Sequence, residues 1–219
     1  ALTEGYSRQQ IELSASAVGG SGTGVKVDGV VRAQDTYLTH ARQRADSDAA
    51  NLGAKSDATT KLAQSLGQPG DPNALATLYR AFETAIGSAI SAPDSVALQQ
   101  GILSAANDLV VSFNLISTET NKIRTDADAA IANDVDTLNS ALKEIESLNA
   151  SIRNSTIAGH SVASLEDQRQ SLIDRANTIV PVRTSKVGQG QLDIYSQSGA
   201  VLLNGSASGR TRGLPAVDS

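Results

Sequence analysis

Apolar and small residues recur at helical spacing over most of the chain, and short runs rich in Pro and Gly interrupt them. Over residues 35–66 these positions alternate by steps of three and four, which predicts a first long helix with a rather weak stripe. The stripe consists of Leu38, Ala41, Ala45, Leu52, Lys55, Thr59, Leu62 and Leu66. A helix with such a stripe is expected to pack along one side.

Two prolines mark the start of a second helix. Pro69 and Gly70 stop the first helix, whereas Asp71 can cap a new one. Pro72 suits a first helical turn, where its missing N–H leaves no bond unmade. The sequence therefore predicts a helix over residues 72–91.

Residues 95–154 contain no proline and a single glycine, Gly101, which predicts one helix of roughly 90 Å at 1.5 Å per residue. Its apolar positions form a seam with one slip of a residue in the middle. The seam consists of Leu109, Phe113, Ile116, Thr120, Ile123, Ala127, Ile131, Val135, Leu138, Leu142, Ile145, Asn149 and Ile152. A seam of this length is typical of a helical bundle or coiled coil.

A shorter helix over 164–180 follows the turn "STIAGHS" and ends at Pro181; Ser164 and Asp167 have the spacing of a capping box. Its stripe is Leu165, Leu172, Ala176 and Ile179, and an arginine, Arg169, falls inside the stripe. Burying an unpaired guanidinium is very unfavourable. Either the stripe lies edge-on at Arg169, or a carboxylate pairs with the cation there, and we favour the paired interpretation.

Alternating apolar residues predict strands at both ends of the chain. "GVKVDGVVR" (residues 24–32) predicts a short strand or hairpin with Val25, Val27 and either Val30 or Val31 on one face. Residues 191–196 and 200–203 predict two further strands, closed by the turn dipeptide Asn204-Gly205.

The predicted fold class is mainly α. It is an elongated bundle of long antiparallel helices, one of about 60 residues, with short β-strands near the N-terminus and a β region at the C-terminal end. We expect an extended or β-hairpin lead-in segment over 1–34 and a rod-like helical domain over 35–182. Residues 183–219 are expected to begin an outer β domain or to be its remnant.

Composition agrees with helices packed through Ala, Leu, Ile and Val, since aromatic residues make up only 3% of the chain. The 23 acidic residues outnumber the 18 basic ones, and no basic run is interleaved with aromatics, which argues against nucleic acid as a partner. No apolar run approaches the roughly 20 residues of a membrane span, and the first residues lack the pattern of a secretory signal. We therefore expect no membrane contact.

The residue types that carry most enzyme chemistry are scarce. The absence of Cys excludes thiol catalysis, thiolate zinc sites and iron–sulfur clusters, and the two histidines, His40 and His160, have no neighbours at metal-ligand spacing. No G-x-S-x-G elbow occurs. The sequence predicts a protein without catalytic residues, cofactor or metal. It also lacks Met, so we expect a processed or excised piece.

Three stretches resemble the family of the first flagellar hook-associated protein. "TEGYSRQ" (residues 3–9) is similar to the family's T-P-G-Y-S-R-Q, with Glu4 in place of the proline, and "GTGVKVDGVVRAQDTYL" (residues 22–38) resembles a run that leads into the first long helix. "LEDQRQSLID" (residues 165–174) resembles L-x-D-Q-R-D-x-L. The matching residues include Gly5, Tyr6, Ser7, Arg8, Gln9, Arg32, Asp35, Asp167, Gln168 and Arg169.

The resemblance implies a structural subunit of the bacterial flagellum at the junction of hook and filament, acting through subunit packing without catalysis. The implied partners are other flagellar axial proteins: the hook protein, a second junction protein and further copies of the subunit in a ring. An export chaperone is implied through a C-terminal segment, and the implied location is extracellular, after export by the flagellar type III system. The family's terminal polymerisation segments are not among these residues, so we expect this piece to be monomeric.

Two alternatives stay open at this point. The chain could be another axial protein, of hook or flagellin type, in which "GYSRQ" is less expected. It could instead be a helical-bundle sensor domain like those of chemotaxis receptors, whose long helices bind a small ligand. The sensor reading requires transmembrane helices in the flanking sequence, which distinguishes it from the flagellar one.

Overall fold

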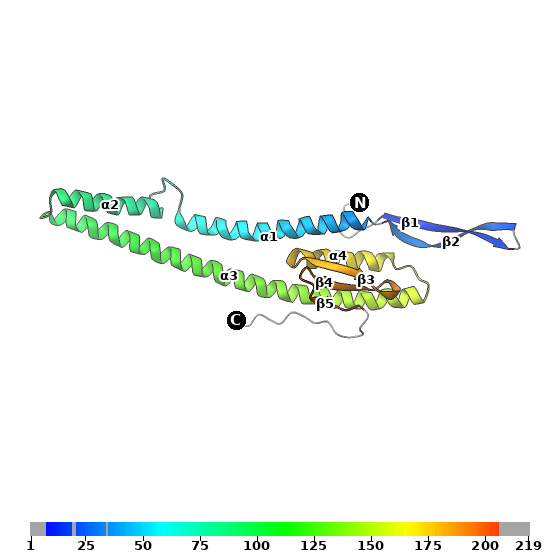
Figure 1. Cartoon of the computed structure of the whole chain (residues 1–219). Coiled ribbons are helices and arrows are strands. Elements are labelled where there is room, and N and C mark those ends of the chain that lie inside the picture. Colours follow the sequence, from blue (N-terminus) through cyan, green and yellow to red (C-terminus); the bar gives the residue numbers. More distant parts are fainter. Residues whose placement is uncertain (1–7, 19–20, 34, 206–219) are drawn as a thin grey trace. The chain divides into compact units, whose positions relative to one another are not determined.

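A computed structural model describes residues 8–18, 21–33 and 35–205 of the chain (Figure 1). Four helices follow one another: α1 (Thr36–Leu66), α2 (Leu75–Ser91), α3 (Val96–Ile157) and α4 (Ala163–Ile179). The strands are β1 (Arg8–Val18), β2 (Ser21–Ala33), β3 (Val182–Lys186), β4 (Leu192–Ser196) and β5 (Val201–Leu203). The chain divides into two compact units, residues 1–51 with 131–219 and residues 52–130.

The predicted fold class is confirmed in its main features. α3 has 62 residues, against about 60 expected, and strands lie before the first helix and after the last. The N-terminal strands are longer than predicted, with 11 and 13 residues. The structure also adds β3, a strand directly after Pro181 that the alternating runs of the sequence do not predict. No helix among the described residues combines the length and hydropathy needed to cross a membrane.

β1 and β2 form an antiparallel hairpin in the first unit. The register shifts twice, between Glu12 and Leu13 and between Ser16 and Ala17, and at each shift β2 carries one more residue than β1. Such bulges bend a strand and increase its twist. The side chains of Val27, Val30 and Val31 lie outside the described part, so the predicted common face is untested, whereas Val25 is exposed.

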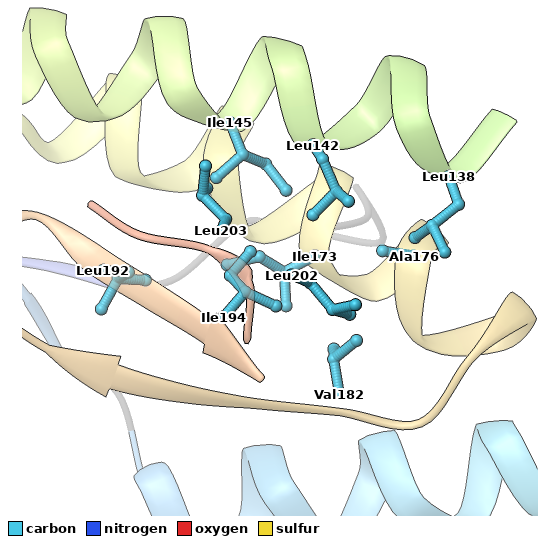
Figure 2. Packing of buried hydrophobic residues seen from close by; sticks show 10 residues of the cluster. All are labelled: Leu138, Leu142, Ile145, Ile173, Ala176, Val182, Leu192, Ile194, Leu202 and Leu203. Carbon is cyan, nitrogen blue, oxygen red and sulfur yellow. The ribbon is translucent and has the colours of Figure 1, made fainter. Parts of the chain in front are cut away.

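The core of the first unit lies between the C-terminal part of α3, α4 and the three-stranded antiparallel sheet β3-β4-β5 (Figure 2). Ten buried residues form it: Leu138, Leu142, Ile145, Ile173, Ala176, Val182, Leu192, Ile194, Leu202 and Leu203. Leu172 and Ile179 pack against its edge, as the predicted stripe of α4 requires. Burial of such side chains stabilises the fold by about 1.5–3 kcal/mol each.

The seam of α3 is packed without interruption from Leu138 to Ile152 and at most of its earlier positions. Every seam position from Leu138 to Ile152 is buried. Before Leu138, Leu109 is buried and four further seam residues are half-buried: Ile116, Thr120, Ile123 and Val135. Phe113 is 56% exposed, and Ala127 and Ile131 are also exposed. The seam prediction was wrong at Phe113, Ala127 and Ile131, because hydrophobic periodicity alone does not show which positions of a stripe meet a partner.

The predicted stripe of α1 does not face the core. Leu38 is 62% exposed and Leu52 is 66% exposed, whereas the two buried residues of α1 are polar, Gln43 and Ser47. Helical spacing places Gln43 and Ser47 nearly opposite the apolar stripe. The packed face of α1 is therefore chosen by hydrogen bonds to α4, described below, and not by hydrophobicity.

Two predicted helix caps are wrong. α4 begins at Ala163 after Val162, with no side-chain cap, so Ser164 and Asp167 do not form a capping box. α2 begins at Leu75 and not at Pro72; the Asp71 carboxylate accepts a bond from the N–H of Asn73 within the preceding turn. At Asp71 the local turn competes with the cap, whereas Ser164 lies within α4, which begins one residue earlier.

Candidate functional site

Arg169 is the buried centre of a polar cluster on α4. The residue is 4% exposed, and its Nη1 donates to Asn149 Oδ1 on α3 and to the carbonyl of Gly190, both at 2.7 Å. Gly190 belongs to the short 3₁₀ turn Gly188–Gly190 between β3 and β4. One guanidinium thus ties α4 to α3 and to the sheet.

Asn149 continues this connection into β4. Its Nδ2 donates to the carbonyl of Leu192 at 2.8 Å, and its Oδ1 accepts from the N–H of Leu192 at 3.2 Å. The side-chain amide therefore bonds both backbone groups of Leu192, as a neighbouring strand would, at the end of β4 beyond the residues paired with β5. With Arg169 as a third partner, the buried amide is well satisfied.

The environment of Arg169 decides between the two alternatives for this residue. Its burial contradicts the edge-on alternative. Within the described part of the chain, the carboxylate paired with it is Glu166, one turn earlier on α4, with its Oε1 3.8 Å from Nη2. Burial, opposed by Glu166 and assisted by the positive charge of Arg32, lowers the pKa of the guanidinium to about 10. The short bonds of Arg169 go to an amide and a carbonyl, and the carboxylate is a distant third partner.

Gly190 lets the turn between β3 and β4 approach α3 closely. Its φ of +78° lies in the left-handed region, and a Cβ there would lie 3.0 Å from Cγ2 of Ile152. Any larger residue would be strained and would push the turn, with its carbonyl, away from Arg169. The preceding Gln189 also has a positive φ, of 59°.

Asp167 connects α4 to the N-terminal hairpin. Its Oδ1 lies 2.7 Å from Nε of Arg32 in β2, and both side chains are largely buried, at 18% and 8% exposure. Separating the partners of a buried ion pair is strongly unfavourable, because each charge would stay buried and unpaired. Such a pair therefore fixes the position of one element relative to the other. The pair joins two of the residues that carry the family resemblance.

Further along α4, Asp174 and Asn177 hold α1. Asp174 accepts from Nη2 of Arg42 at 2.5 Å and from Nε2 of Gln43 at 3.0 Å. Asn177 donates to the carbonyl of Gln43 and accepts from the N–H of Val182 at the start of β3. These hydrogen bonds hold the face of α1 that carries Gln43 against α4.

The remaining predicted residues have separate positions. Asp35 directly precedes α1 and caps it: its Oδ1 accepts from the N–H of Leu38 at 3.1 Å. Gln168 is exposed, although both its neighbours on α4 are held by contacts. Arg8 is exposed in β1, and Gln9 pairs with Arg32 in the hairpin. Gly5, Tyr6 and Ser7 lie outside the described residues.

Sequence reasoning missed Asn149, Asp174 and Asn177 as members of this cluster. Asn149 had a usable signal, because it is a polar residue at a seam position otherwise filled by apolar side chains. Asp174 and Asn177 are ordinary polar residues of an amphipathic helix, and only their distant partners distinguish them. Over residues 8–18, 21–33 and 35–205, no group of three His, Asp or Glu is placed to hold a metal ion.

Comparison with known proteins identifies the family. The model of the flagellar hook-associated protein FlgK helical domain matches residues 59–214. The chain belongs to this family. This match confirms the resemblance drawn from the three motifs. It also excludes the two alternative interpretations, a hook or flagellin-type subunit and a receptor sensor domain.

Relatives named flagellar hook-associated protein 1 match almost the whole chain. The protein of Escherichia coli K12 is 29% identical over 96% of the chain, and that of Salmonella typhimurium LT2 is 27% identical over 96%. The protein of Bacillus subtilis 168 is 24% identical over 93%. The chain spans only 40%, 39% and 42% of the length of these relatives.

A solved structure shares the fold. The flagellar hook junction protein FlgK from Burkholderia pseudomallei superposes with a TM-score of 0.64 and 20% sequence identity. The match covers 77% of this chain and 29% of that one. At this identity the likeness is evidence for the fold alone.

Proposed function

We propose that this FlgK-family chain is part of a structural subunit of the bacterial flagellum at the junction of hook and filament, and that it acts through subunit packing without catalysing a reaction. The observation that carries the proposal is the family match over residues 59–214. The relatives' name, hook-associated protein 1, supports the location, and the FlgK from Burkholderia pseudomallei is called a hook junction protein.

The polar cluster supports a mechanical role. Arg169, Asn149 and the Gly190 turn join two helices to a sheet, and Asp167 adds the hairpin. These bonds link segments that are 20 or more residues apart in sequence, so that a force on one element reaches the others. A subunit that acts through packing needs elements held in fixed positions, and satisfied polar networks make a fold rigid.

The proposed partners are the hook protein, a second junction protein and neighbouring copies of the subunit, with an export chaperone acting through a C-terminal segment. The proposed location is extracellular, after export by the flagellar type III system. We also propose the limits 1–34 for the lead-in segment, 35–182 for the helical domain and 183–219 for the start of an outer β domain. The partners and the location rest on the family, and the limits rest on the sequence pattern.

Complementation tests the proposal. A strain lacking its hook-associated protein 1 is given the full-length gene that encodes this chain, and the protein is located by immunogold electron microscopy while swarming is measured. We expect labelling at the hook tip and restored swarming. A diffuse cytoplasmic protein, in cells that swim equally well with or without it, would contradict the flagellar role.

A pair of variants links this assay to the structure. Ile173 is 1% exposed in the core, so Ile173→Asp buries a carboxylate and should abolish both labelling and swarming. Gln168→Asp introduces the same group on the exposed side of α4 and should complement fully. Equal behaviour of the two variants would show that the fold of this unit is not needed for the role.

A further inference from the structure

A cavity of about 660 Å³ opens beside the polar cluster in the first unit. β2, α1, α4, β3 and β4 contribute its walls, and Arg32, Glu166, Arg169 and Lys186 are its charged lining residues. Thr36 and Thr184 also line it. Three cations therefore face one carboxylate in a protein whose net charge is −5.

Two of the three cations are buried. The side chains of Arg32 and Arg169 are only 8% and 5% exposed. Asp167 neutralises Arg32 at 2.7 Å, but Glu166 is 3.8 Å from Arg169. The Nε of Arg169 is buried and has no hydrogen-bond partner among the residues that the structure describes. A buried donor without an acceptor is unfavourable, and an acceptor in the cavity would remove this penalty.

We propose that this cavity binds an oxyanion, a carboxylate or phosphate group, held by the guanidinium of Arg169, the ammonium of Lys186 and the hydroxyls of Thr36 and Thr184. Arg169 supplies the buried end of the site, already fixed by Asn149 and Gly190. Lys186 is exposed and supplies the charge at the open side. Charge-assisted bonds to guanidinium and ammonium groups are the contacts that select such anions. The site is independent of the flagellar role.

The test follows the Nε–Hε signal of Arg169 by ¹⁵N NMR on the full chain. The signal is assigned by its loss in Arg169→Lys. Sodium phosphate is titrated at constant ionic strength, balanced with sodium chloride, so that general screening does not change. We expect a saturable shift of the Arg169 signal. A shift that stays linear, or none at all, overturns the proposal.

Two charge reversals provide the matched comparison. Lys186→Glu and Lys143→Glu make the same change of charge on exposed side chains of the first unit, but only Lys186 lines the cavity. We expect Lys186→Glu to weaken phosphate binding at least about fivefold, because it replaces an attraction by a repulsion. Lys143→Glu should bind like the parent chain. Equal weakening by both variants means that ions bind the surface at large, and overturns the site.

A second probe distinguishes the sources of the anion. N-acetylglutamate amide stands for an acidic side chain of a protein, and inorganic phosphate for a free ion. Tighter, Lys186-dependent binding of the glutamate derivative assigns the site to a protein carboxylate, and the reverse order assigns it to phosphate. If Lys186→Glu fails to fold by circular dichroism, Lys186→Gln replaces it, with Lys143→Gln as the control.

Discussion

Arg169 shows how a cation is tolerated among apolar side chains. Two neutral acceptors at 2.7 Å carry its short bonds, and the one nearby carboxylate is 3.8 Å away. Neutral acceptors are themselves less costly to bury than a carboxylate, and here both belong to backbone or amide groups that the fold already orders. The arginine therefore fixes the position of α4 along α3, since its two acceptors lie on different elements.

We expect Arg169→Ala to lower the free energy of unfolding by about 1.5–3 kcal/mol, the range for hydrogen bonds to a charged group. Part of the loss comes from the carbonyl of Gly190, which loses the guanidinium as its partner. Urea denaturation followed by circular dichroism measures the change. Gln168→Ala, on the exposed neighbour, should stay within about 0.5 kcal/mol. Equal effects of the two substitutions would mean that Arg169 is not buried in solution.

At the scale of elements, α4 is the connector of the first unit. One of its faces contributes Ile173 and Ala176 to the apolar core. Its polar residues reach four other elements: Asp167 bonds β2, Arg169 bonds α3, Asp174 bonds α1, and Asn177 bonds α1 and the start of β3. A helix of 17 residues thus fixes the positions of its neighbours by polar bonds as much as by apolar packing.

The turn between β3 and β4 gives a test at this scale. Gly190→Ala should lower the free energy of unfolding by about 1–3 kcal/mol, because φ is +78° and the new Cβ would lie 3.0 Å from Ile152. Gly188→Ala changes the same turn, where a Cβ meets nothing within 4 Å, and should change stability by less than about 1 kcal/mol. Thermal unfolding of both variants measures this. The opposite order of stabilities would contradict the close approach of the turn to α3.

At the scale of the whole molecule, the two units differ in how much they bury. All ten residues of the apolar core belong to the unit made of residues 1–51 and 131–219. In residues 52–130 only Ala74 and Leu109 are buried hydrophobics, and large apolar side chains such as Leu103, Val110 and Leu115 are more than half exposed. Stability is therefore expected to be uneven along α3, which runs through both units.

Two leucines of α3 test this difference. Leu142 is 1% exposed and Leu103 is 69% exposed. We expect Leu142→Ala to lower the free energy of unfolding by about 2–4 kcal/mol through lost burial and a residual cavity, and Leu103→Ala by less than about 0.5 kcal/mol. Hydrogen exchange should also be slower for amides around Leu142 than around Leu103. Comparable exchange at the two positions would indicate uniform stability along the helix.

Sequence reasoning was most successful where a signal is local and long. The ends of α1, α3 and α4 agree with the predicted ranges to within a few residues, because uninterrupted helix formers and proline boundaries act locally. The cap at Asp71 failed because its carboxylate has a competing local partner, and the cap at Ser164 failed because α4 begins one residue before it. β3 was missed because five residues with a single buried side chain, Val182, carry almost no pattern.

The sequence by itself determined the helical class, the position of the long helix and the family, and it singled out Arg169 as an anomaly. These conclusions rest on periodicity and on short motifs, which are local properties of the sequence. Only the tertiary structure decided which face of α1 is buried and which groups hold Arg169. Asn149 and Gly190 lie 20 and 21 residues from Arg169, on other elements, and Asp174 lies more than 130 residues from Gln43. Hydrogen bonds between such distant groups leave no periodic trace in the sequence, because each depends on where the folded backbone places its two ends.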